Sequence, residues 1–150
     1  MPIADILGDV PACLLEHPGT PFGGLHAAAA LAAAGDGIGI ERLRRYAAGH
    51  PDPTFPGVVA PLCTGLAALV AGDPERAVQP LAAVAGQVGR LGGSPAQQEV
   101  VVETLIHALI ASGRTVAACR LISERLDRRP APVDRRRLWQ LSQRSLTRGR

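Results

Sequence analysis

Glu99, Glu103 and His107 recur at four-residue intervals, and this is the spacing in the chain best suited to chemistry. Side chains four residues apart lie on one face of an α-helix, so two carboxylates and an imidazole would form a single stripe. Such a stripe is suited to metal binding or to acid and base catalysis. A solvated polar face with an ordinary Glu103 to His107 pair explains the same spacing, and we favour that simpler interpretation.

The histidines and cysteines give little support for a metal site or a catalytic nucleophile elsewhere in the chain. The four histidines form neither an ExxH nor an HExxH motif, which argues against a metal site. Cys63 and Cys119 fall on predicted helices among apolar neighbours, a pattern typical of buried packing. The three cysteines are widely spaced and match no metal or redox motif, so we expect reduced thiols and no disulfide. We therefore assign no catalytic residue, no metal and no cofactor, and expect a protein that is not an enzyme.

The elements that would position these residues are helices that end in a recurring way, at Gly35, Gly72 and Gly113. Each glycine follows an apolar helical stretch, and the spacing of about 40 residues is typical of stacked helix hairpins that cover each other's apolar faces. The expected helices span 25–34, 40–48, 58–71 with a bend at Pro61, 74–91 with a kink at Pro80, a long helix launched by a capping box at 94–97, a partner helix over 115–130, and 134–146.

Composition sets the outer bounds. A chain of 150 residues with 47% hydrophobic and 3% aromatic residues predicts one all-α domain over 1–150, with a core of small aliphatic side chains. Residues 1–20 form a poorly defined N-terminal segment in this prediction, and residues 131–150 form a basic capping helix and tail. The sequence has no basic leader and no apolar run of the roughly 20 residues that cross a bilayer, so we expect a cytoplasmic protein with no membrane partner.

Residues 72–78 and 113–119 resemble the turn and second helix of tetratricopeptide repeats, with Ala77 and Ala118 where that repeat requires a small residue. More narrowly, four segments are similar to the C-terminal part of the tetratricopeptide repeat protein 38-like family: Pro61-Leu62-Cys63, Leu91-Gly92-Gly93-Ser94, Ala96-Gln97 and Thr104-Leu105-Ile106. The resemblance covers roughly 22–129. It implies a right-handed α-α superhelix of about three hairpins closed by a C-terminal capping helix.

The resemblance also bears on the candidate site. In such arrays the first helix of each hairpin lines a concave groove, which would place the Glu99, Glu103 and His107 stripe there. His26 matches a histidine of the family and would lie nearby. The family carries a histidine, then an arginine and an aspartate, where this chain has Pro95, Gln98 and Glu99, so a polar site built on those groups does not transfer.

Charge is divided unevenly along the chain. Residues 114–150 contain eleven arginines against three carboxylates, a net of +8, whereas residues 1–113 carry five arginines and ten carboxylates, a net of −5. The partner-binding candidates are therefore Arg135, Arg136, Arg137, Trp139 and Arg144. A soluble basic cap explains the same arginines, and we favour packing on the preceding hairpin over partner binding for Trp139.

Three functions follow from these patterns, and the first is favoured. It is a non-catalytic scaffold that binds a protein or peptide partner, including a second copy of itself as a homodimer. The second is a small-molecule-binding or catalytic accessory protein that uses the Glu99, Glu103 and His107 stripe. Nucleic-acid binding through the arginine-rich end is the least favoured, because no aromatic residues alternate with the arginines.

Overall fold

The computed structural model describes the backbone of residues 12–148 and the side chains of residues 13–143 other than Ala96. Within this range the chain is all-α and contains no strand. The elements in chain order are α2 (Ala12–Glu16), α3 (Pro21–Ala33), α4 (Gly37–Ala48), the π-helical turn η1 (Phe55–Val59), α5 (Ala60–Val70), α6 (Pro74–Ala85), the 3₁₀ turn η2 (Val88–Leu91), α7 (Pro95–Ala111), α8 (Thr115–Arg128) and α9 (Pro132–Arg148).

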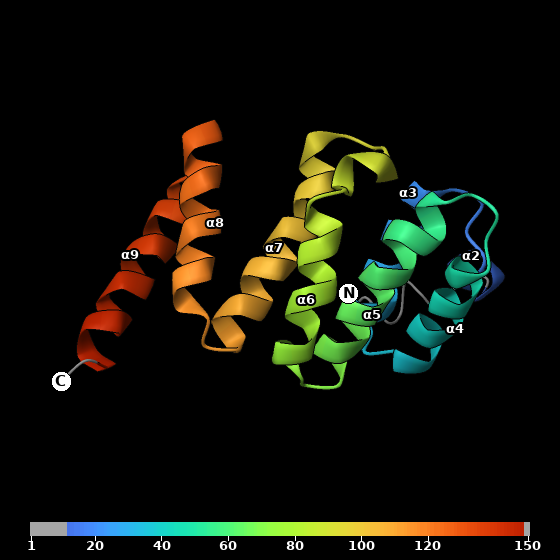
Figure 1. Cartoon of the computed structure of the whole chain (residues 1–150), viewed down its shortest axis with the longest axis horizontal. Coiled ribbons are helices and arrows are strands. Elements are labelled where there is room, and N and C mark those ends of the chain that lie inside the picture. Colours follow the sequence, from blue (N-terminus) through green and yellow to red (C-terminus); the bar gives the residue numbers. More distant parts are fainter. Residues whose placement is uncertain (1–11, 149–150) are drawn as a thin grey trace.

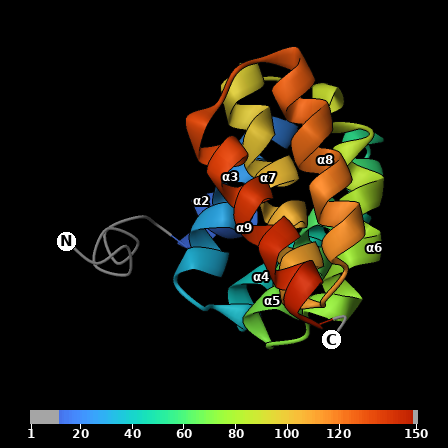
Figure 2. The same cartoon turned by 90° about the vertical axis from the view of Figure 1, so that its left-hand side faces the viewer.

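The helices follow one another along the long axis of the molecule, from α2, α3 and α4 at one end to α9 at the other (Figure 1). Each helix from α3 to α9 packs against the next in the chain, and α3 also packs against α5. Figure 2 looks along this axis, with α9 and α8 nearest the viewer. The arrangement confirms an all-α protein in which successive helices cover one another. No described helix is both long and apolar enough to cross a bilayer.

One type of turn closes the helix pairs α3–α4, α5–α6 and α7–α8. Gly35, Gly72 and Gly113 lie at φ values of 71°, 75° and 77°, a region that side chains with a Cβ rarely adopt. The residue after each glycine donates its amide to the carbonyl five residues back, over 2.8 to 2.9 Å. The glycine amide donates to the carbonyl three residues back, over 3.0 to 3.1 Å. These are Schellman turns, so the three glycines do what their spacing predicted.

The residue after the glycine starts the next helix. Asp36 caps α4 by accepting a hydrogen bond from the Gly39 amide over 2.8 Å, and Asp73 caps α6 in the same way from the Arg76 amide over 3.1 Å. Arg114 stands at this position before α8 and supplies no side-chain cap. Its guanidinium instead pairs with Glu75 on α6, so the third turn is held partly by an ion pair between helices.

The capping box predicted before α7 is confirmed. Ser94 Oγ accepts from the Gln97 amide over 3.4 Å, and Gln97 Oε1 accepts from the Ser94 amide over 2.9 Å. Several boundaries differ from prediction, including the starts of α4 at Gly37 and of α9 at Pro132, which lie three and two residues before the predicted starts. Because Thr20 caps the helix and Pro21 occupies its first turn, α3 begins earlier than residue 25. The chain forms η1 before α5, and α6 continues past Pro80 but ends at Ala85, so the helix predicted to reach Leu91 is broken by η2.

The core is built from aliphatic side chains, with one aromatic ring among the largest buried groups. The fully buried side chains of greatest volume are Phe55, Ile40, Leu43, Leu62, Leu81, Ile106, Ile122, Val58, Val59, Val84 and Val101. Gly65 marks the closest approach of α5 to α6, since a Cβ there would stand 2.6 Å from Leu81 Cγ and 3.4 Å from the Ala77 carbonyl oxygen. Small residues at this crossing allow the two helices to approach closely.

Candidate partner-binding surface

The predicted carboxylate stripe on α7 faces arginines from the two helices that follow it. Glu103 accepts hydrogen bonds from Arg125 of α8 over 2.8 Å and from Arg137 of α9 over 2.6 Å. Glu99 accepts from Arg129, beyond the end of α8, over 2.7 Å. The expected pairing of Glu103 with His107 is therefore wrong, because arginines at the inter-helix contact occupy both of its oxygens. His107 is exposed.

Arg125 is the centre of this network. Its Nη1 contacts Glu103, and its Nη2 lies 2.9 Å from Asp134 Oδ2 on α9. The Arg125 side chain is 11% exposed and that of Asp134 is 3% exposed, so the pair is shielded from water. A single guanidinium thus joins α7, α8 and α9. Its Nε and Asp134 Oδ2 are buried without a hydrogen bond of good geometry, so burial of this network is only partly compensated.

Arg125 and Asp134 were not among the site residues predicted from the sequence. A signal for Arg125 was present, because it follows Ala118 and Ile122 at helical spacing on the face of α8 that is buried. A charged residue in that position requires a buried partner. The identity of the partner depends on how α9 packs, which the spacing of residues within α8 does not reveal.

The network also sets the charge state of its members. Burial by itself would raise the pKa of Glu103, but the hydrogen bonds from Arg125 and Arg137 outweigh it and hold that pKa below its usual value. Burial opposes the charge of Arg125 in the same way, and the Glu103 and Asp134 carboxylates nevertheless raise the pKa of the guanidinium. Glu103 and Arg125 are therefore charged near neutral pH, and the network acts as an ionic clamp between helices.

On the opposite side of α9, Arg135 and Arg136 form no ion pair with another described residue. Asp134 and Leu141 are buried and Leu138 is partly buried, which defines the packed side of the helix. At 100° per residue, Arg135, Arg136 and Trp139 fall on the side facing away from that packing. Trp139 is 64% exposed, so the favoured interpretation that it packs on the preceding hairpin is wrong. We call Arg135, Arg136 and Trp139 the outer face of α9.

The other two arginine candidates do not join the described outer face. Arg137 points to the flank of α9 and pairs with Glu103, so it belongs to the ionic clamp. The side chain of Arg144 lies outside the described residues. His26 is exposed on α3 and packs edge-on against Phe22, with ring centroids 4.4 Å apart. Among the described residues, no hydrogen bond or ion pair joins His26 to the α7 stripe.

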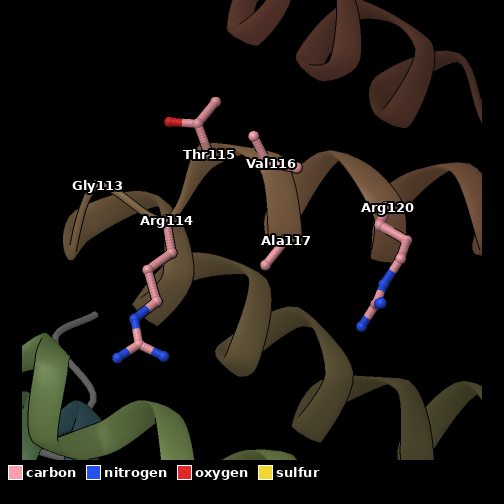
Figure 3. A pocket seen from close by; sticks show the side chains of 6 residues that line it. All are labelled: Gly113, Arg114, Thr115, Val116, Ala117 and Arg120. Carbon is pink, nitrogen blue, oxygen red and sulfur yellow. The ribbon is translucent and has the colours of Figure 1, made fainter.

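Surface hollows lie near the glycine turns. One of about 440 Å³ surrounds the first turn of α8 (Figure 3). Arg114, Ala117 and Arg120 point to one side of the helix there, and Thr115 and Val116 point to the other. Both arginines are already engaged, Arg114 with Glu75 and Arg120 with Glu124 at 3.7 Å. We assign no ligand to this hollow, since its charged groups are satisfied within the chain.

The cysteines fit the packing interpretation. Cys63 is buried, and burial raises the pKa of its thiol to about 12, so Cys63 is a poor nucleophile near neutral pH. Cys119 is half-buried and Cys13 is exposed, and all three are free thiols. Within residues 12–148, no group of three or more His, Cys, Asp or Glu side chains is placed to hold a metal ion.

Comparison with known proteins adds no relative: no protein family, no curated protein and no solved structure matches this chain. The resemblance to the tetratricopeptide repeat protein 38-like family stays a prediction from the sequence. Any functional conclusion must therefore come from the geometry of the described residues.

Proposed function

We propose that this chain is a non-catalytic protein-interaction module, built of tetratricopeptide-like helix hairpins, that binds a partner protein through the outer face of α9. The observation that carries the proposal is the exposure of Trp139 beside Arg135 and Arg136. Tryptophan and arginine are the residues most enriched among those that dominate binding energy at protein interfaces. An exposed tryptophan also costs solvation free energy that a partner would recover.

The hairpin architecture supports this proposal. Arrays of packed helix hairpins present extended surfaces and commonly serve as binding scaffolds. The recurring glycine turns and the close crossing of α5 and α6 near Ala77 support a tetratricopeptide-like repeat. The ionic clamp supports the surface itself, because it holds the packed side of α9 and so fixes the direction in which the outer face points.

Photo-crosslinking from position 139 tests the proposal. A photoreactive analogue of tryptophan, which keeps the indole, replaces Trp139 in the full chain expressed in its native cells, and a second variant carries it at Val116, which is 85% exposed on α8. We expect a discrete crosslinked protein from position 139 that is absent from position 116. The purified product should then bind the unmodified chain in solution. Equal labelling patterns at the two positions, together with a strictly monomeric chain in light scattering, would overturn the proposal.

A further inference from the structure

Three arginines around the start of α9, Arg128, Arg135 and Arg136, have no carboxylate partner within the described part of the chain. Arg135 and Arg136 lie on the outer face of α9, and Arg128 lies at the end of α8 near the same turn. All three are exposed. By contrast, Arg125, Arg129 and Arg137 are all held in ion pairs. Arg135 and Arg136, one helical turn before Trp139, therefore form a surface of uncompensated positive charge beside it, whereas Arg128 lines a hollow with Gln98 and Glu99 of α7.

From this juxtaposition we propose that the outer face of α9 binds an acidic, amphipathic segment of a different protein. Its carboxylates would pair with Arg135 and Arg136, and one of its apolar side chains would cover the Trp139 indole. Guanidinium groups bind carboxylates with two parallel hydrogen bonds, which gives this pairing directional specificity. The inference rests on the proposed function and names the chemistry of the partner.

A second copy of the chain is a poor occupant. Among the described residues, every carboxylate except Asp127 already holds an ion pair or a helix-capping or turn hydrogen bond. Apart from Asp127, the described carboxylates that another copy would offer to Arg135 and Arg136 are therefore already engaged. A partner with unpaired carboxylates can bind Arg135 and Arg136 without breaking an existing ion pair or hydrogen bond.

Nucleic acid fits the face less well than an acidic protein does. Single-stranded binding relies on several aromatic platforms along a basic groove, whereas this face presents one tryptophan. Val133, also exposed near the start of α9, adds apolar surface that phosphates do not use. The combination of apolar and cationic groups matches a segment that is both apolar and acidic.

The sequence provides a direct readout, because Trp139 is the only tryptophan in the chain. Its fluorescence reports on the outer face without a label. The first probe is a synthetic helical peptide of Glu and Leu, about 20 residues long so that it forms a helix in water. The matched probes are the same peptide with Lys in place of Glu, a poly-glutamate without apolar residues, and single- and double-stranded DNA oligonucleotides.

We expect the Glu and Leu peptide to shift Trp139 emission to shorter wavelengths and to bind at least tenfold more tightly than any other probe. Its affinity should fall at least tenfold between about 50 and 500 mM salt, because the pairs are exposed and screened. The double variant R135Q/R136Q should weaken binding about tenfold or more. The double variant R76Q/R90Q removes the same charge elsewhere and should change binding by less than about twofold.

Several results would overturn the inference. These are tighter binding to DNA or to the Lys peptide, an equal loss of binding in the R76Q/R90Q control, or binding that is indifferent to salt. Such results leave the proposed function standing if position 139 still crosslinks to a neutral or basic partner. If position 139 crosslinks to nothing, the proposed function fails as well. Far-ultraviolet circular dichroism of each variant verifies that the fold is retained.

Discussion

Asn in place of Asp134 should have opposite effects on stability in two backgrounds. In the native chain, Asp134 is a buried carboxylate 2.9 Å from Arg125, so D134N removes a favourable charge pair. In the R125M background the same carboxylate is buried without its cation. There D134N removes an uncompensated charge, and it should stabilise the protein. If the effect of D134N on the free energy of unfolding changes sign between the two backgrounds, Asp134 stabilises the protein through its charge pair with Arg125 and not through packing alone.

The magnitudes follow from burial. Removal of one partner of a buried ion pair costs about 3 to 5 kcal/mol, because the other charge is left without compensation. Glu103 is 43% exposed and keeps Arg137, so its share of the loss is small. We expect R125M to lower the free energy of unfolding by about 3 kcal/mol and D134N by about 1 to 2 kcal/mol. In the R125M background, D134N should restore about 2 kcal/mol.

Urea denaturation provides the assay, with two signals recorded on the same sample. Far-ultraviolet circular dichroism follows all helices, and the fluorescence of Trp139 follows α9. Arrays of helix pairs can lose cooperativity, so an earlier transition in fluorescence would mean that α9 detaches before the rest unfolds. If D134N has the same effect in both backgrounds to within about 0.5 kcal/mol, the two residues are independent and the reasoning about the clamp is refuted.

Three further outcomes are expected. Cys63 should resist alkylation at pH 8 in the folded protein while Cys13 reacts, and mass spectrometry after urea treatment should show Cys63 modified only on unfolding. G65A should lower the urea midpoint by an amount equivalent to about 1 to 3 kcal/mol, because the added Cβ would clash with Leu81 of α6. G86A is the control, since its Cβ would make only ordinary contacts and the substitution should leave stability unchanged. Equal effects of the two substitutions would contradict the close crossing of α5 and α6. Hydrogen bonds from two arginines of α4 lower the pKa of Glu41 to about 2, so its stabilisation is present above pH 4.5 and is lost as the pH falls towards 2. The difference in free energy of unfolding between the native chain and E41Q should therefore be under about 1 kcal/mol at pH 7, as for an exposed pair, and the corresponding difference in melting temperature should vanish near pH 2.

The helix boundaries that the sequence predicted well are those fixed by local chemistry. Gly35, Gly72 and Gly113 end helices because only glycine adopts their backbone conformation without strain, and this preference is visible in the residue type itself. The box at Ser94 is likewise complete within four residues. Local signals of this kind depend little on the rest of the fold, so they can be interpreted without a structure.

The boundaries that the sequence did not predict depend on tertiary packing. Phe55 lies among prolines and a glycine that favour a loop, yet the structure buries its ring completely within η1. The free energy of burying that aromatic ring offsets the poor local propensity. The helix predicted to reach Leu91 ends at Ala85, and the 3₁₀ turn that follows still delivers Leu91 to the core.

The candidate site was predicted in its residues but not in its roles. Glu99 and Glu103 form a stripe on α7 as expected, but the stripe meets arginines that lie 30 and 22 residues further along the chain. Helical periodicity places side chains on a face and does not say what lies opposite that face. The same reasoning applies to Arg137 and Trp139, which are two residues apart in sequence and lie on different sides of α9.

The shared geometry of the glycine turns makes the length of this molecule adjustable in whole steps. A duplication or deletion of one segment, from one such turn to the next, would leave the glycine backbone conformation of the turns at both ends unchanged. The cationic end would then be carried nearer to or farther from the amino-terminal helices by a fixed increment. Repetition of the same turn therefore makes the distance between the two ends depend on the number of helix pairs that separate them.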